Sequence, residues 1–255
     1  MGTNNREEPV ESMYVEGRNA VLETLRSDAT VERIFVQKAL DDGPIRSILR
    51  DAKKRDVRVQ FVEKERLDQL SETGHHQGVI AQTAAAAYAT VEEMIANARE
   101  AGEAPFLVML DGIQDPHNLG AIIRSAHQAG CHGVILPKQR AVGLTPTAMR
   151  ASAGAAAYTP VARVTNLVTT MEDLKKEGLW FACADMDGEV YHRANLSGPF
   201  CLVVGSEGDG VSRLVREHCD FTVSIPMKGK IDSLNASVAA GILLFEAARQ
   251  RDEKK

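Results

Sequence analysis

The sequence predicts an α/β protein with a parallel sheet in its C-terminal part and a smaller α/β unit before it. Two observations support this class. Apolar runs typical of buried strands alternate along the chain with stretches of helical periodicity, which is the order of a parallel sheet joined by helices. The apolar runs near the C-terminus also end in polar, glycine-containing loops, and ligands bind at the carboxyl ends of parallel strands.

The first unit is expected to span residues 13–83, after a tail at 1–12 that lacks apolar periodicity and is expected to be disordered. Its predicted helices carry apolar stripes at Val21, Leu22 and Leu25, at Ile45, Ile48, Leu49 and Ala52, and at Leu67 and Leu70, and its predicted strands cover residues 34–36, 57–62 and 79–81. A connector of small residues at 84–89 leads to a helix that begins near Thr90 and to a second unit at 90–255.

Basic residues cluster in the first unit, and the sequence leaves two interpretations of them open. The cluster consists of Arg46, Arg50, Lys53, Lys54, Arg55 and Arg58, with Lys64 and Arg66 beyond it. It is either a solvated helix face interleaved with Asp51 and Asp56 or a patch that faces RNA. The net charge of −5 disfavours a general attraction to nucleic acid, so only a local patch would supply it. Residues 75–78 offer two histidines, but a turn before an edge strand is the better interpretation.

The second unit opens with a predicted buried strand at 106–110 and a loop at 111–118 that is dense in turn formers. Asp115 or Asn118 is suited to cap the following helix, which Gly130 would end in a left-handed conformation. The core stripe of this helix is expected at Leu119, Ile122, Ile123 and Ala126, and another face carries Gly120, Arg124 and His127. From spacing alone, Arg124 is more simply a surface or ion-paired arginine than a catalytic one.

The remaining elements extend the sheet. Further strands are predicted at 133–136, 180–184, 201–204 and 221–225, with helices that begin at Thr145–Pro146, cover 212–218 and follow Asn235. The loop at 205–210 has three glycines around two carboxylates, and no phosphate-cradle motif occurs, which indicates a ligand held by backbone groups. The last helix has a face of small residues and a face of larger ones, and a second copy of the chain is a candidate to pack on it.

Composition excludes several classes of protein. The four cysteines lie far apart and mostly in apolar runs, so reduced core thiols are expected rather than disulfides or a zinc site, and no metal is predicted. No run approaches the roughly 20 apolar residues needed to span a bilayer. The N-terminus is polar and acidic rather than a signal peptide, so a cytoplasmic location is expected.

Three segments resemble the signature motifs of the SpoU (TrmH-type) RNA 2′-O-ribose methyltransferases of the SPOUT superfamily. They are DGIQDPHNLGAIIR at 111–124, VGSEGDG at 204–210, and IPM at 225–227 together with SLNAS at 233–237. The segments GRNAV at 17–21 and HQGVIA at 76–81 are also similar to the N-terminal RNA-binding domain of the subgroup that methylates a guanosine in 23S rRNA. Only the tail before Met13 lies outside the resemblance.

The resemblance implies a fold, a cofactor and a partner. The C-terminal half is expected to form a trefoil-knotted parallel sheet with helices on both faces, a rare exception to the rule that chains are unknotted. The methyl donor S-adenosylmethionine is expected to lie in the knot loops, and members of the family act as homodimers. The cofactor-binding positions implied here are Val204, Gly205, Ile225, Met227 and Leu234.

The resemblance also assigns catalytic positions, namely Asn118, Arg124, Glu207, Ser233 and Asn235. The family's proposed base or activator is at Arg124, but a guanidinium hardly ever loses its proton. The Arg124 guanidinium can more easily bind the neighbouring phosphate and stabilise a forming alkoxide. Glu207 is expected to fix Arg124 or its neighbours, and Ser233 and Asn235 are expected to order the loop over the donor. For Glu207 and Asn235, roles as a loop anchor and a helix cap are compatible with these.

The expected reaction is methyl transfer from S-adenosylmethionine to the ribose 2′-hydroxyl of a guanosine in 23S rRNA. Two alternatives stay open. The first is a tRNA ribose methyltransferase, although the tRNA enzymes of the family generally lack the N-terminal domain. The second is a non-catalytic RNA-binding factor in ribosome assembly, against which the joint presence of Asn118, Arg124, Glu207 and Asn235 argues.

Overall fold

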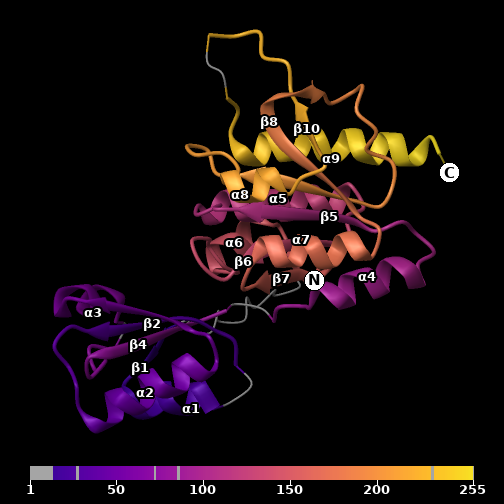
Figure 1. Cartoon of the computed structure of the whole chain (residues 1–255). Coiled ribbons are helices and arrows are strands. Elements are labelled where there is room, and N and C mark those ends of the chain that lie inside the picture. The colour runs from indigo at the N-terminus through magenta and orange to yellow at the C-terminus, as the bar shows by residue number, and fades with distance from the viewer. Residues whose placement is uncertain (1–13, 27–28, 72, 85–86, 231–232, 255) are drawn as a thin grey trace, which may run out of the picture. The chain divides into compact units, whose positions relative to one another are not determined.

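A computed structural model describes residues 14–26, 29–71, 73–84, 87–230 and 233–254, and the chain divides into two compact units between Ala87 and Tyr88 (Figure 1). The tail expected at 1–12 lies outside these residues. Among the helices described, none is both long enough and apolar enough to cross a membrane. The same residues contain no cluster of His, Cys, Asp or Glu side chains arranged to hold a metal ion.

The first unit contains a four-stranded sheet with the strand order β1-β4-β2-β3. Its elements are β1 (Tyr14–Glu16), α1 (Arg18–Arg26), β2 (Val31–Gln37), α2 (Gly43–Lys54), β3 (Arg58–Val62), α3 (Lys64–Leu70) and β4 (Val79–Thr83). The pair β2–β3 is parallel, and β4 pairs antiparallel with both β1 and β2. β4 is therefore an interior strand, and the expectation of an edge strand after residues 75–78 is wrong. Its side chains enter apolar clusters on both faces of the sheet, Val79 and Ala81 on one and Ile80 on the other.

The second unit is a six-stranded sheet, ordered β10-β8-β9-β5-β6-β7, in which every neighbouring pair is parallel. Its strands are β5 (Phe106–Asp111), β6 (Gly133–Pro137), β7 (Val161–Val164), β8 (Trp180–Val190), β9 (Phe200–Gly205) and β10 (Phe221–Ser224). Its helices are α4 (Val91–Glu100), α5 (Pro116–Gln128), α6 (Pro146–Ala151), α7 (Leu167–Lys176), α8 (Arg213–Glu217) and α9 (Ala236–Asp252), with a 3₁₀ turn η1 (Ala155–Ala157). The predicted α/β class with a parallel sheet is confirmed.

Helices cover both faces of this sheet. Met94 of α4, Met171 of α7 and Val215 of α8 join strand side chains in one buried cluster. The helices α5, α6 and α9 contribute nothing to that cluster; α5 packs against both α6 and α9, and α9 also contacts β9. These three helices therefore cover the opposite face, which explains why the central strands are apolar along their whole length.

Several elements differ from those predicted. β7, α7 and β1 were not expected, and β8 continues to Val190 instead of ending at Ala184. The second half of β8 is mostly polar, so no apolar run predicts it as a strand. β10 nevertheless pairs with both halves of β8, with a register shift between Thr222 and Val223. Tyr88 and Ala89, which fall in the linker expected at 84–89, belong to the second unit. The Tyr88 hydroxyl accepts the Leu144 N–H at 2.8 Å, and the Ala89 N–H donates to the Val161 carbonyl at 2.8 Å.

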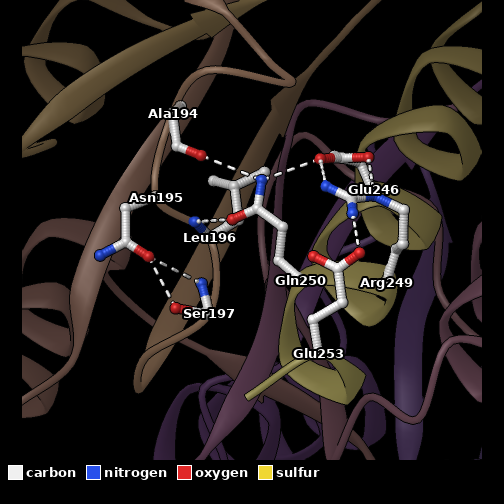
Figure 2. Close-up of polar contacts among 8 residues, drawn as sticks. All are labelled: Ala194, Asn195, Leu196, Ser197, Glu246, Arg249, Gln250 and Glu253. Atoms are coloured by element: carbon white, nitrogen blue, oxygen red, sulfur yellow. Dashed lines mark hydrogen bonds and ion pairs between the residues drawn. The ribbon is translucent and has the colours of Figure 1, made fainter.

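The C-terminal end of α9 is fastened to the connection between β8 and β9 (Figure 2). The Gln250 amide donates to the Ala194 carbonyl at 3.0 Å and accepts from the Leu196 N–H at 2.8 Å. Arg249 donates to Glu246 from two nitrogens, and these hydrogen bonds hold the pKa of the Glu246 carboxyl below its usual range. Because Gln250 satisfies backbone groups of a distant segment, it fixes the end of α9 more firmly than the exposed pairs along the helix do.

Gly120 allows α5 and α6 to approach closely. A Cβ at this position would lie 2.4 Å from the Ala148 carbonyl oxygen and 2.5 Å from the Ala151 Cβ, both in α6. These distances are well below van der Waals contact, and the obstructing groups are backbone or a side chain with no freedom to move. The packing of α5, which carries Asn118 and Arg124, therefore requires glycine here.

This close approach predicts that Gly120→Ala lowers the free energy of unfolding by about 1–3 kcal/mol, because the added methyl overpacks the α5–α6 contact. Gly241→Ala in α9 is the matched control, since a Cβ there meets only the Ser125 Oγ at 3.6 Å. The control should leave stability unchanged or raise it by up to about 1 kcal/mol through helix propensity. Urea unfolding at one protein concentration measures both, and equal stabilities of the two variants would contradict the packing argument.

Candidate active site

The candidate site lies where β5, β9 and β10 end, at the carboxyl edge of the second unit's sheet. β5 and β9 are neighbours, and Asp111 is paired with Gly205 in the last register position, so the loops after them start side by side. An Asp111 carboxylate oxygen accepts the Ser212 N–H at 2.8 Å, which ties the beginning of one loop to the end of the other. The sequence pattern did not predict this link; the matching ends of the two strands are the signal that would have indicated it.

The loop after β9 folds into a tight turn. Ser206 and Gly210 exchange two backbone hydrogen bonds of 3.1 and 3.0 Å. A Cβ on Gly205 would lie 2.0 Å from the Gly210 carbonyl carbon and 2.2 Å from the Val211 nitrogen, so only glycine fits where the strand ends. The turn presents Glu207 at its exposed tip, two residues after a fully buried strand.

Three predicted site residues meet around Glu207: Asn118 from α5, Glu207 itself, and Asn235 before α9. The same Glu207 oxygen, Oε1, accepts from the Asn118 side-chain amide at 3.1 Å and from the Asn235 side-chain amide. The Asn235 amide also donates to the Asn118 side-chain oxygen at 2.9 Å. The three side chains therefore form a closed cycle of hydrogen bonds that joins segments 28 to 117 residues apart.

The direction of each bond in the cycle follows from the cap of α9 and from the carboxylate of Glu207, which can only accept. The Asn235 side-chain oxygen accepts the N–H groups of Ser237 and Val238 at 3.0 and 3.3 Å, so its amide nitrogen must point toward Glu207. Asp115, not Asn118, caps α5, because its carboxylate accepts the His117 N–H at 2.9 Å. Asn118 is thereby left for the cycle, where its side chain is buried.

Arg124 and Ser233 lie outside the cycle. Arg124 is exposed, and it makes no hydrogen bond or ion pair with any residue that the structure describes. It follows Asn118 by six residues, which places it roughly 240° further around α5. The partners of Glu207 are consequently Asn118 and Asn235 and not Arg124. Ser233 is exposed and hydrogen-bonds to no described residue, and the two residues before it lie outside the described ranges.

The expected cofactor positions offer unpaired backbone at this edge of the sheet. Val204 and Gly205 are buried at the end of β9, and Ile225, Met227 and Leu234 are half-buried in the segments that follow β10 and precede α9. The backbone groups of Ile225, Met227 and Leu234 make no hydrogen bond with other residues in the described ranges. Half-buried N–H and C=O groups without partners are costly unless water or a ligand satisfies them, so this edge suits a ligand held by backbone groups.

A separate cavity of about 450 Å³ lies between α4, β7 and α7. It is lined by residues such as Thr90, Arg99 and Leu174 and by none of the predicted site residues. Two of its lining side chains, Arg99 and Glu177, form an ion pair with each other. The chemistry expected from the sequence therefore belongs to the loop edge of the sheet and not to this cavity.

Two family models match the chain. The model of the SpoU rRNA Methylase family matches residues 105–245, and a model described as RNA 2′-O ribose methyltransferase substrate binding matches residues 14–89. A Bacillus subtilis protein named as the putative TrmH family tRNA/rRNA methyltransferase YacO is 47% identical over 241 residues, covering 94% of this chain and 96% of its own. A Staphylococcus haemolyticus protein named in the same way is 42% identical over 245 residues, covering 96% of this chain and 98% of its own.

Solved structures of related proteins also resemble the chain. The SpoU methyltransferase AviRb from Streptomyces viridochromogenes, crystallised with the cofactor AdoMet (S-adenosylmethionine), aligns with a TM-score of 0.61 and 25% identity over 98% of this chain and 95% of its own. A TrmH/SpoU tRNA modifying enzyme from A. aeolicus aligns with a TM-score of 0.54 and 30% identity, over only 64% of this chain and 85% of its own.

The cycle predicts that Asn235→Asp destabilises the protein although it preserves the helix cap. The new carboxylate still accepts the two N–H groups of α9 but faces Glu207, and like charges in contact cost about 1 kcal/mol or more. Asn166→Asp is the matched control, because Asn166 caps α7 in the same way, with N–H groups of Val168 and Thr169 at 2.9 and 3.3 Å. Urea unfolding should show a lower free energy of unfolding only for Asn235→Asp. An equal change in the two variants would show that Asn235 acts only as a helix cap.

Proposed function

The chain belongs to the SpoU rRNA methylase family and is an S-adenosylmethionine-dependent RNA 2′-O-methyltransferase, and from that premise we propose that its acceptor is the ribose of a guanosine in 23S rRNA. The observation that carries the assignment of the site is the hydrogen-bonded cycle of Asn118, Glu207 and Asn235. It brings together one residue from each of the three segments that resemble the family motifs.

The extent of the first unit supports an rRNA acceptor over a tRNA acceptor. A substrate-binding family model covers this unit at residues 14–89. The tRNA modifying enzyme from A. aeolicus aligns over only 64% of the chain. We assign RNA affinity to the first unit, because the whole chain is acidic and a local surface must supply the attraction to phosphate. Work on ribosomal RNA fits the cytoplasmic location expected from the sequence.

Different residues of the second unit have different roles in the proposed reaction. Bound S-adenosylmethionine supplies an electrophilic methyl group, and the unpaired backbone at Ile225, Met227 and Leu234 is suited to hold it. A ribose 2′-hydroxyl is a weak nucleophile, so it must be placed in line, and its developing charge must be stabilised as its proton passes to solvent water. The Arg124 guanidinium donates hydrogen bonds to the neighbouring phosphate and to the forming alkoxide. The cycle around Glu207 keeps the loops in place, and Ser233 orders the segment before α9.

A second copy of the chain is the proposed partner of α9. Val238 and Phe245 are large apolar side chains that remain about half exposed, at 49% and 52%, and they lie seven residues apart on one side of the helix. Tyr158 is 76% exposed and stacks on His127 of α5, which packs against α9. An apolar strip on adjoining helices is typical of a surface that a symmetric dimer buries.

The acceptor is tested by transfer of a tritiated methyl group from S-adenosylmethionine to isolated 23S rRNA and, separately, to bulk tRNA. We expect label in 23S rRNA, located at the 2′-oxygen of one guanosine after nuclease digestion. Label in tRNA alone would show that the acceptor is tRNA and not 23S rRNA. RNA binding without transfer to either would favour the non-catalytic assembly factor.

The role of Arg124 predicts that Arg124→Ala lowers the transfer rate by about a hundredfold or more, a typical effect of removing one donor that stabilises developing charge. Affinity for S-adenosylmethionine, measured by calorimetry, should be unchanged because the guanidinium acts on the acceptor. Arg213→Ala is the control, since Arg213 is also exposed in this unit and, among the residues that the structure describes, pairs only with Glu217 of its own short helix. Loss of cofactor affinity in Arg124→Ala would show that its role is misassigned.

A further inference from the structure

We propose that a pocket at the start of α1 in the first unit binds an unstacked base of the RNA substrate. The pocket has a volume of about 510 Å³ and is lined by Arg18, Gln37, Leu40, Lys64, Asp68, Gly74, His76, Gln77 and Gly78. Its size falls in the range of about 300–1,000 Å³ typical of small-ligand sites. The inference rests on the proposed function, because it identifies where the RNA of that reaction is held.

Hydrogen bonds and an ion pair hold the wall of the pocket. Arg18 is fixed by three contacts: its N–H donates to the Gln77 side-chain oxygen at 3.2 Å, its Nε donates to the Gln77 carbonyl at 3.1 Å, and its guanidinium pairs with Asp42 at 2.8 Å. His76 is buried and holds the adjoining turn: its Nδ1 accepts the Gly78 N–H at 3.0 Å, which leaves the ring proton on Nε2 to be donated to Asp68 at 2.9 Å. The pocket is therefore formed before any ligand arrives.

The pocket also concentrates backbone strain. Five non-glycine residues with positive φ occur in the described part of the chain, and two of them adjoin this pocket: Ala39, with φ of 63°, and Gln77, with φ of 51°. Non-glycine residues disfavour this conformation, and such strained positions cluster at binding and catalytic sites. Glycine would adopt a positive φ at either position without strain, but the sequence has alanine and glutamine there.

Two polar groups in the pocket are left for a ligand. The side-chain amide of Gln37 is half-buried at the end of β2, and it makes no hydrogen bond with the residues that the structure describes. The ammonium group of Lys64 is exposed at the start of α3 and, within the same ranges, has no ion pair. An amide offers both a donor and an acceptor to a base edge, a fixed guanidinium plane is a stacking surface, and an ammonium group pairs with phosphate. Together they match one nucleotide of single-stranded RNA.

The basic cluster on α2 is a weaker candidate for the same task. Arg46 donates to both carboxylate oxygens of Asp41, at 2.8 and 2.9 Å, and Arg55 donates to backbone carbonyls that include those of Leu25 and Ala29. Of its remaining members, Lys53 and Lys54 have no partner in the described part of the chain and sit in the last turn of α2, where cations stabilise the helix end. One strained residue, Asp56 with φ of 54°, follows this cluster, whereas two strained residues, Ala39 and Gln77, adjoin the pocket.

The test uses the full-length protein and 23S rRNA transcribed in vitro. Gln37→Met keeps the volume of the side chain and removes its amide, so RNA affinity should fall about tenfold with no change in its salt dependence. Lys64→Gln removes one phosphate contact, so affinity should fall and the slope of log affinity against log salt should decrease by about 0.7–1. The double variant Lys53→Gln/Lys54→Gln should change neither quantity beyond the weak effect of distant charge.

The outcomes separate this proposal from the proposed function. Calorimetry with S-adenosylmethionine and thermal unfolding should be the same for all variants, because the cofactor segments belong to the other unit. Unchanged RNA affinity in Gln37→Met and Lys64→Gln, with normal binding by the unsubstituted protein, would overturn the pocket. A loss confined to the Lys53→Gln/Lys54→Gln variant would move the RNA contact to α2. Failure of the unsubstituted protein to methylate any RNA would instead overturn the proposed function.

Discussion

A closed cycle of three hydrogen-bonded side chains makes one site out of three segments that are far apart in the sequence. Glu207 alone in the cycle carries a charge, and it receives two amide donors at a single oxygen. The Asn235 amide is oriented by the N–H groups of α9 that it caps, and the buried Asn118 amide donates to Glu207 and accepts from Asn235. The loops after β9 and before α9 are thus positioned relative to α5 without a metal-binding cluster or a disulfide among the described residues.

The rigidity of this cycle depends on packing further away. α5 is pressed against α6 at Gly120, and the far end of α9 is held by Gln250 to the connection between β8 and β9. Both helices that contribute amides are therefore anchored along their length, while the loops between them carry the unpaired backbone. The binding groups therefore lie on loops, and helices hold those loops in place. This arrangement is common where a site must be both accessible and well positioned.

Much of this could be predicted from the sequence, because strong local patterns were present. The structure confirms the strands predicted from the apolar runs of β5, β6 and β9. It also confirms the start of α6 at its cap and proline, and the left-handed glycine after α5. The polar half of β8 could not be predicted, because its strand conformation comes from pairing with β10 rather than from its own residues. The interior position of β4 was missed for the same reason: order within a sheet is set by contacts between segments and not by local periodicity.

The candidate site shows the same limit. Motif positions named Asn118, Glu207 and Asn235, but their mutual hydrogen bonds and the link between Asp111 and Ser212 depend on which strands are neighbours. Arg124 is placed by the fold on an exposed face of α5, apart from the cycle, which agrees with a role toward the acceptor rather than toward Glu207. Its roles and those of Ser233 remain predictions.

We propose that the segments held together by the cycle bind a sulfonium cofactor through backbone groups. Isothermal titration of the folded protein with S-adenosylmethionine, and with its demethylated product, tests this claim most directly. We expect saturable heat for one site per chain with both ligands, and a clear loss of affinity when Glu207→Ala removes the shared acceptor. A well-folded protein that gives no heat with either ligand would contradict the account.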